Sequence, residues 1–357
     1  MTDFAKFDAD GHVFERDTEI FEHLEAPFCY YPELAASGLF PRSDNWNRQA
    51  RNIFDGRAKR VARSDSDGTR FVEPQRWIDF LDEGDLEGAV LYPTAGLAMG
   101  KVKEPEWAVP LARAYNNWLK ARFLDSSPRL KGVAVLPMQE PDEAAKELRR
   151  AVGELGMVAA VIPAVGLRRY LGDTKYDPVY QTAQELDVPL AIHGGAAEGM
   201  GLDAFDKPLK ARTLSHPFAQ LIQLTDMMYS GLFDRFPALR ISFMEAGIGW
   251  LVFLLDRMVR STDLGWMPEA PLLKRSPREH LTSGRIFFHC EMDEKVLPYA
   301  VGVIGDDAML YASDFPHQPP GDCIAEQRDF VERADLADES KAKILGANAR
   351  RLYNLAA

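Results

Sequence analysis

The residues of this chain best suited to bind a metal follow its first predicted strand. Asp8, Asp10 and His12 are two apart, and side chains two apart on a strand share a face, so we expect them to project together. Asp10 and His12 stand at the carboxyl end of that strand. A carboxylate and an imidazole placed so closely can bind one divalent cation. The D-x-H pattern alone is common, so its meaning depends on where the other candidates lie.

Four later predicted strands also end near a side chain that can bind a metal or move a proton. His193 closes the fifth strand, Glu245 the sixth and Asp314 the eighth, while Glu291 follows the seventh. In a closed parallel barrel, active-site groups lie at the carboxyl ends of the strands. If these strands form such a barrel, the candidates meet on one rim.

The negative charge of the candidate carboxylates indicates a bound cation. Three carboxylates brought together, those of Asp10, Glu245 and Asp314, would raise one another's pKa values unless a cation or protons intervened. One dication leaves a net charge of about −1 on three carboxylates, and Glu15 would add to it if it pointed inward. This remaining negative charge indicates a protonated histidine nearby or a second metal.

Two histidines are candidates for that positive charge and for acid–base chemistry. Ser215 is a plausible helix N-cap and Pro217 suits a first helical turn, which would place His216 at a helix start. His317 follows the eighth strand. We interpret His23, His280 and His289 as structural, because we expect none of them at a strand end beside glycine.

The elements that must position these residues alternate regularly. Apolar, β-branched runs predict eight strands, at 5–10, 88–92, 131–137, 157–163, 188–193, 239–245, 285–290 and 308–313. Helical patterns separate them, at 73–81, 104–124, 141–155, 177–186, 216–236, 249–260 and 294–304, with a further set from about residue 322. Eight strand–helix units predict a (β/α)₈ TIM barrel, although a doubly wound open sheet would give a similar local pattern.

We expect residues 1–357 to form a single domain, with residues 15–71 inserted after strand one as a lid or cap. A second long connection, at 194–213, follows strand five, and long connections on one side of a barrel usually form the walls of its site. The first insertion carries aromatic residues and a cationic cluster, made of Arg42, Arg48, Arg51, Arg57, Lys59, Arg60 and Arg63. Its members either pair with neighbouring acids or face an anionic substrate.

Composition excludes several other classes of function. A net charge of −12 argues against nucleic acid as a partner. No apolar run approaches the roughly 20 residues that span a bilayer, and the first residues lack the layout of a secretion signal, so we expect no membrane partner and a cytoplasmic protein. Cys29, Cys290 and Cys323 form no C-x-x-C pair, which suits reduced thiols.

Taken together, the motifs resemble one family. The opening D-x-H, the segment 192–195 (Ile-His-Gly-Gly), the run from 230 through Glu245-Ala-Gly-Ile-Gly-Trp to 251, and the closing segment 313–317 (Ser-Asp-Phe-Pro-His) are similar to the amidohydrolase-related (amidohydrolase 2) branch of the amidohydrolase superfamily. That branch includes aminocarboxymuconate semialdehyde decarboxylase and the decarboxylases of hydroxylated aromatic acids. The resemblance implies a (β/α)₈ barrel that usually holds one zinc or manganese, with Asp10, His12, His193 and Asp314 in the ligand positions. It also implies a homo-oligomer such as a dimer.

This chain departs from the superfamily pattern at three strands. Strand four ends in Ile162-Pro163-Ala164 with no lysine, so the carboxylated-lysine bridge of the dinuclear hydrolases is absent. Strand six ends in Glu245, where many members have a histidine. The first motif has Asp10 where H-x-H is common, and the aromatic acid decarboxylases also carry a carboxylate there.

Three functional hypotheses follow. The first is metal-dependent, nonoxidative decarboxylation or metal-assisted hydrolysis of a small carboxylated substrate, with Glu245, His216 and His317 as catalytic acid–base groups and zinc or manganese as the metal. The second is a dinuclear iron oxygenase or hydroxylase on the same barrel. The third is a non-catalytic structural subunit.

Overall fold

The computed structural model describes residues 4–41, 71–195, 200–202 and 204–355. The predicted cationic cluster at 42–63 lies outside the described residues, so the role of 15–71 as a lid stays a prediction. Within the described part of the chain, no helix has both the length and the apolar character needed to cross a bilayer.

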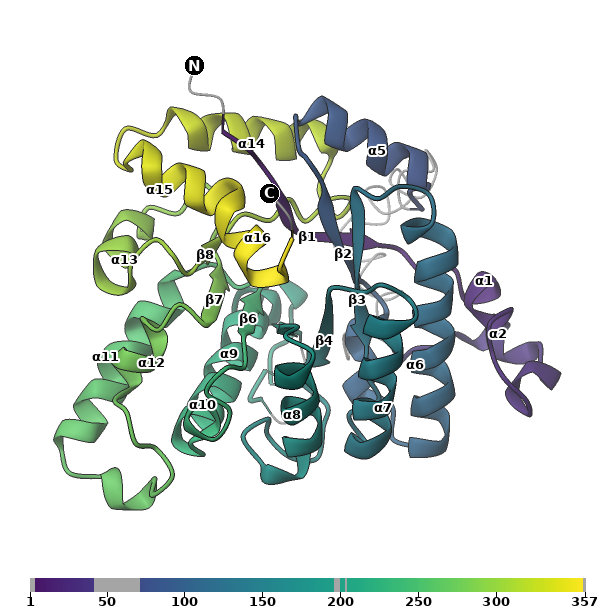
Figure 1. Ribbon diagram of the computed structural model, residues 1–357, viewed down its shortest axis with the longest axis horizontal. Helices are drawn as coiled ribbons and strands as arrows, with labels where there is room; N and C mark the ends of the chain where they lie inside the picture. The colour runs from purple at the N-terminus through teal and green to yellow at the C-terminus, as the bar shows by residue number, and fades with distance from the viewer. Residues whose placement is uncertain (1–3, 42–70, 196–199, 203, 356–357) are drawn as a thin grey trace.

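Eight parallel strands form one sheet in sequence order, surrounded by helices (Figure 1). The strands are β1 (Asp8–Val13), β2 (Ala89–Pro93), β3 (Leu130–Val135), β4 (Ala159–Pro163), β5 (Leu190–His193), β6 (Ile241–Met244), β7 (Ile286–His289) and β8 (Met309–Leu310). The predicted number and order of strands are correct, and the (β/α)₈ barrel is confirmed.

The barrel closes between its first strand and the segment after its last. Ala9 N donates to Tyr311 O at 3.1 Å, Asp314 N donates to Asp10 O at 3.2 Å, and His12 N donates to Phe315 O at 2.7 Å. Strand β8 is short, but these three bonds continue its path along β1. The closure therefore brings Asp314 directly beside the D-x-H segment.

The helices are α1 (Asp17–Phe21), α2 (Glu33–Ser37), α5 (Pro74–Glu83), α6 (Pro105–Leu119), α7 (Pro141–Gly153), α8 (Asp177–Glu185), α9 (Pro208–Tyr229), α10 (Leu232–Arg235), α11 (Gly249–Asp263), α12 (Pro277–Leu281), α13 (Leu297–Ile304), α14 (Pro320–Glu332), α15 (Asp338–Ala342) and α16 (Asn348–Tyr353). Most of the helices cover the outside of the strands, whereas the first two lie beyond α6 (Figure 1). Several begin with proline in their first turn, where its missing N–H costs no helical bond. Short 3₁₀ helices are η1 (Phe28–Tyr30), η2 (Gly96–Lys101), η4 (Thr174–Tyr176) and η5 (Met267–Glu269), and π turns are η3 (Lys120–Leu124) and η6 (Lys343–Ala347).

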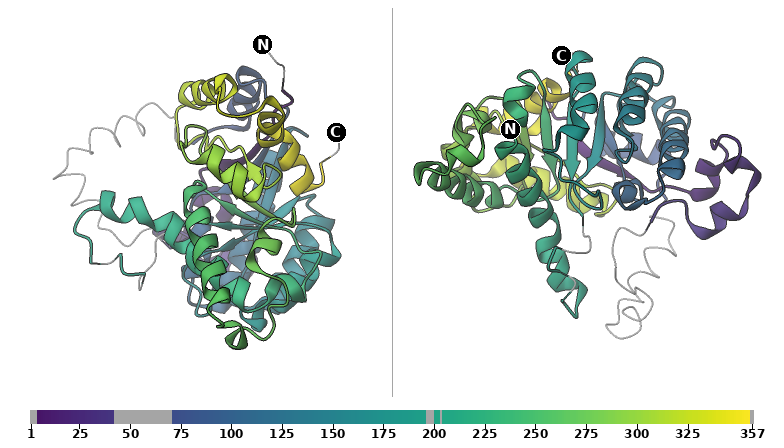
Figure 2. Two further views of the ribbon diagram at one scale, coloured as in Figure 1. Left: turned by 90° about the vertical axis from the view of Figure 1, so that its left-hand side faces the viewer. Right: turned by 90° about the horizontal axis from the view of Figure 1, so that it is seen from below.

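Helix α9 begins earlier than the sequence indicated. It starts at Pro208, so His216 lies in its middle, Pro217 is an interior proline and Ser215 is not an N-cap. The prediction was wrong because Pro208 also satisfies the first-turn preference. Figure 2 shows the first turns of α9 standing out from the body of the barrel.

The C-terminal segment packs across the amino-terminal end of β1. Phe7 N donates to Leu345 O at 2.8 Å. The buried Tyr353 hydroxyl donates to Ala9 O at 2.8 Å and lies 2.8 Å from the Tyr92 hydroxyl. These contacts hold β1, the strand that carries Asp10 and His12, at its amino-terminal end.

Candidate metal centre

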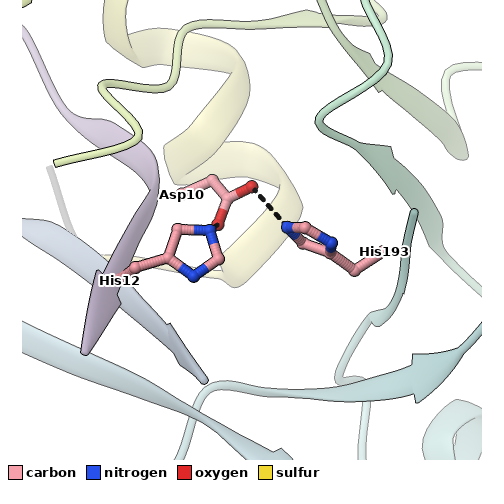
Figure 3. A group of neighbouring side chains, drawn as sticks. All are labelled: Asp10, His12 and His193. Carbon is pink, nitrogen blue, oxygen red and sulfur yellow. Dashed lines mark ion pairs between the residues drawn. The ribbon is translucent and has the colours of Figure 1, made fainter. Parts of the chain in front are cut away.

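Four buried polar atoms from three parts of the barrel lack a hydrogen-bond partner and converge at its carboxyl-terminal rim. They are Asp10 Oδ1, His12 Nε2, His193 Nε2 and Asp314 Oδ1. The ligand atoms of Asp10, His12 and His193 all lie within 4.8 Å of one another, and so do those of His12, Asp314 and His317. Figure 3 shows Asp10 between the two imidazoles.

In both imidazoles, the tautomer leaves a lone pair on Nε2, the atom that lies where the four buried atoms converge. His12 Nδ1 lies 2.9 Å from Pro93 O, and His193 Nδ1 lies 3.2 Å from Gly194 O. A carbonyl oxygen only accepts, so both Nδ1 atoms carry the proton and both Nε2 atoms are acceptors. Burial lowers the pKa of His12 well below its usual range and that of His193 to about 4, which keeps both rings neutral.

These lone pairs face carboxylate oxygens, not donors. His12 Nε2 lies 3.5 Å from Asp10 Oδ1 and 3.6 Å from Asp314 Oδ1, and His193 Nε2 lies 3.6 Å from Asp10 Oδ2. Acceptors held this close and buried require a proton or a cation between them. Two imidazole nitrogens and two carboxylate oxygens match the donors that zinc, manganese and iron take in proteins. The donor set therefore fits a divalent metal.

Two features of the sequence make the approach of these side chains possible. A Cβ on Gly11 would lie 2.1 Å from Trp77 Cη2, so glycine between Asp10 and His12 lets that ring pack on the strand. A Cβ on Gly194 would lie 2.5 Å from His216 Cδ2, so the Gly194 position lets α9 bring its histidine to the rim.

Glu245 and His216 form the more open side of the cluster. Glu245 Oε2 lies 3.1 Å from His193 Nε2 and 3.7 Å from His216 Nε2. Burial raises the pKa of Glu245, but the nearby imidazoles of His216 and His193 outweigh it and lower that pKa to about 2. Glu245 has φ of 53°, an uncommon conformation for a residue with a Cβ, and such conformations cluster at functional sites.

Asp314 shows the opposite shift. Burial and the adjacent Glu245 charge raise its pKa to about 9, so without a cation it keeps its proton at neutral pH. Burial, with Glu245 and Asp314 next in effect, also raises the pKa of Asp10 well above its usual range. The sequence-based expectation that the three carboxylates raise one another's pKa values agrees with these directions for Asp10 and Asp314, but not for Glu245, whose pKa is lowered.

His317 lies beside His12 on the side of the rim nearest β2. The ring centroids of His317 and His12 are 4.6 Å apart, and Phe14 lies 4.8 Å from His317. Thr94 Oγ1 is 3.1 Å from His317 Nε2. The structure thus brings together all seven predicted site residues, namely Asp10, His12, His193, His216, Glu245, Asp314 and His317.

Two other sequence-based expectations, for Asp8 and Glu291, were wrong, and the open question of whether Glu15 points inward is answered. Asp8 is not in the cluster: β1 shifts register between Asp8 and Gly11, and the Asp8 carboxylate accepts from Ser313 N and Oγ. Glu15 does not face the cluster but binds backbone N–H groups after β2. Glu291 is exposed and in none of the metal-binding groups found among the described residues.

One further assignment was incomplete, and several supporting residues were missed. His289 does end a strand, β7, although it was placed away from strand ends. Thr94, Ser313, Gln220 and Glu294 were not identified. Thr94 directly follows β2, so its position at a strand end was the available signal; the contacts of the others depend on tertiary structure. Gln220 Nε2 donates to Met244 O, and Glu294 accepts from Ile248 N at 2.9 Å.

A closed parallel barrel with histidines and carboxylates gathered at its carboxyl-terminal rim defines a class of metal-dependent barrel enzymes. Within that class, the chain belongs to the amidohydrolase family, whose model matches residues 8–355. The predicted membership is confirmed.

Curated relatives of the chain include decarboxylases. Gamma-resorcylate decarboxylase of Polaromonas sp. (strain JS666 / ATCC BAA-500) is 28% identical over 297 residues, covering 78% of this chain and 87% of that protein. 2-Amino-3-carboxymuconate-6-semialdehyde decarboxylase of Dictyostelium discoideum is 25% identical over 285 residues, covering 79% of this chain and 77% of that protein. The prediction of an amidohydrolase-superfamily enzyme agrees with these relatives, and neither is an oxygenase.

A solved structure shares the fold over nearly its whole length. It is a dihydroxybenzoic acid decarboxylase from Polaromonas sp. JS666 with bound manganese and the inhibitor 2-nitroresorcinol. The TM-score is 0.75 at 24% identity, covering 99% of this chain and 98% of that one. At this identity the likeness supports the barrel fold.

Proposed function

We propose that this protein is a divalent-metal-dependent, nonoxidative decarboxylase of a hydroxylated aromatic carboxylic acid. The observation that carries the proposal is the convergence of four buried, unpartnered donor atoms, from Asp10, His12, His193 and Asp314. The decarboxylase relatives favour carbon–carbon cleavage over hydrolysis, and the manganese in a similar structure makes manganese the first metal to test.

In this proposal the four converging side chains hold the metal. When bound, the metal supplies Lewis-acid stabilisation of negative charge on the oxygens of the substrate. The substrate carboxylate and an adjacent ring hydroxyl are the groups that a cation at this position recognises. Zinc remains an alternative, because the donor set suits both ions.

The reaction needs a proton on the ring carbon that carries the carboxylate. Protonation of that carbon allows the carbon–carbon bond to break, its electron pair returns to the ring, and carbon dioxide leaves. We assign the proton transfer to Asp314, because its side chain is 19% exposed, the most open of the four converging side chains, and so can reach a bound substrate. His317, in one donor group with Asp314 and His12, returns a proton to Asp314 from solvent.

Glu245 is assigned a different role from the acid expected from sequence. With a pKa of about 2 it is ionised at neutral pH and cannot donate a proton. We propose that its carboxylate accepts a hydrogen bond from a ring hydroxyl, while His216, beside it on the open side, binds an oxygen of the substrate.

The direct test is product analysis with metal-loaded protein. Protein loaded with manganese is incubated with 2,6-dihydroxybenzoate and other hydroxybenzoates, and carbon dioxide and the phenol are measured. We expect equimolar phenol and carbon dioxide, lost on chelation and restored by manganese. Absence of carbon dioxide from every hydroxybenzoate tested, with metal bound, would reject the proposal.

Two further proposals, on cellular location and oligomeric state, accompany this function. We propose a cytoplasmic location, supported by the composition, and a homodimer, supported by the family resemblance. Fractionation of the native host and light scattering of the purified protein test them.

A further inference from the structure

The Glu15 carboxylate, in the loop after β1, binds backbone N–H groups and does not face the metal cluster. Its two oxygens accept from three consecutive backbone N–H groups after β2: Thr94 N at 3.1 Å, Ala95 N at 2.8 Å and Gly96 N at 2.8 Å. Glu15 and this turn come from neighbouring strands, so the bonds tie the loop after β1 to the loop after β2.

The turn held by Glu15 carries a contact to a proposed proton-transfer group. Thr94 Oγ1 lies 3.1 Å from His317 Nε2, and Phe14, next to Glu15 in sequence, packs edge-on against the same ring at 4.8 Å. His317 N in turn donates to Asp314 O at 2.8 Å. His317 is therefore oriented from the loops after β1, β2 and β8.

We propose that Glu15 is a positioning residue: by binding the N–H groups of residues 94–96 it fixes Thr94, and Thr94 fixes the His317 imidazole. This inference rests on the proposed proton-transfer role of His317. It gives a function to a carboxylate that lies beside the cluster and contributes no ligand atom to the metal-binding groups.

The chemistry of the contact requires a carboxylate. When ionised, Glu15 offers only acceptors, and three N–H donors directed at it use both oxygens. An amide would place an NH₂ donor against at least one of these N–H groups. Burial raises the pKa of the Glu15 carboxyl to about 7, while the N–H bonds oppose that rise.

The first experiment tests the contact without using activity. Hydrogen exchange at the amides of residues 94–96 is compared in manganese-loaded wild-type and Glu15→Gln protein, together with the ¹⁵N shifts of the His317 ring. We expect faster exchange at these three amides and a changed His317 signal. Glu19→Gln is the matched control, since Glu19 lies four residues on and accepts from Trp118 Nε1 at 2.9 Å. Unchanged exchange in Glu15→Gln would overturn the inference.

The second experiment tests the consequence for turnover with a double-mutant cycle. Changes to residues that orient active-site groups typically cost roughly 10- to 100-fold, so we expect Glu15→Gln to lower kcat by about 10-fold with KM and metal content unchanged. Thr94→Val removes the hydroxyl without disturbing the N–H groups, and we expect a similar loss. In a His317→Gln background, Glu15→Gln should cause no additional loss.

The outcomes separate this inference from the proposed function. A full additional loss in the double variant shows that Glu15 does not act through His317. A wild-type protein without decarboxylase activity rejects the proposed function, whereas the exchange and ¹⁵N measurements still decide whether Glu15 positions Thr94 and His317.

Discussion

The two sides of the rim differ in how fully the protein encloses them. On the β1 side, the side chains of Asp10 and His12 are 3% and 0% exposed, and the strand is bonded to neighbours on both edges. On the β6 side, Glu245 and His216 are 25% and 26% exposed. Enclosure favours a fixed set of ligands, and exposure favours contact with a substrate. One rim can thus separate metal binding from substrate recognition.

The strongest test of this contrast is loss of a proposed ligand on the enclosed side. We expect Asp10→Ala to weaken metal binding by more than about 100-fold, because changing even the outer partners of ligands costs roughly 10- to 100-fold. Metal per chain is measured by atomic emission after dialysis. Asp79→Ala, an exposed residue on α5, is the control. Full metal content in Asp10→Ala would remove Asp10 from the ligand set.

Asp314 lies between the two sides, and its substitution separates chemistry from binding. At saturating manganese we expect Asp314→Asn to lower kcat by about 10²- to 10⁴-fold, the usual contribution of a positioned acid. Single-turnover rates measure the step directly. Asp307→Asn, an exposed carboxylate near β8, should leave turnover unchanged. A kcat within a factor of about two of wild type would assign the proton to another group.

Substitutions on the open side should weaken substrate binding more than metal binding. We expect His216→Gln to raise KM by about 10-fold, the loss of one hydrogen bond to a charged group, while metal content stays constant. Steady-state kinetics and metal analysis of the same preparation measure both. Loss of metal in His216→Gln would show instead that the two sides are not separate.

Removal of the metal should expose the charge conflict among the carboxylates of the rim. Asp314 has a folded pKa of about 9 against an ordinary value of 3.8, so between these values the folded chain holds a proton that the unfolded chain has lost. Stability of the metal-free protein should therefore fall as pH rises from 6.5 to 9, by about 1–3 kcal/mol. Below 6.5, His193 acts in the opposite direction, because its folded pKa is about 4.

Thermal unfolding with and without manganese measures this effect. The metal-bound protein should show a smaller fall over the same range, since a cation keeps Asp314 ionised at both ends. Equal stability of the metal-free protein at pH 6.5 and pH 9 would contradict a buried, protonated Asp314.

The sequence predicted which side chains gather at the rim better than it predicted the residues that support them, for a physical reason. Strand ends can be located from apolar runs, and the barrel places all strand ends on one rim, so Asp10, His193 and Glu245 could be grouped without coordinates. The same reasoning failed for Asp8, because a register shift cannot be seen in a pattern of alternating residues.

Contacts between neighbouring loops could not be predicted from the sequence pattern. Glu15 was weighed as a charge near the metal, yet its partners are backbone N–H groups at 94–96, which any residue type provides. The start of α9 was missed because two prolines, Pro208 and Pro217, suit a first turn equally well, and only packing distinguishes them.

The link between Tyr353 and Ala9 has a consequence for biosynthesis. The ribosome releases Asp10 and His12 early, but the strand that carries them gains its neighbouring segment at 311–315 and its support from Tyr353 only after hundreds more residues have emerged. Until then, two strong chelating groups belong to an unpaired strand. Metal capture by this protein is therefore expected to follow translation rather than accompany it.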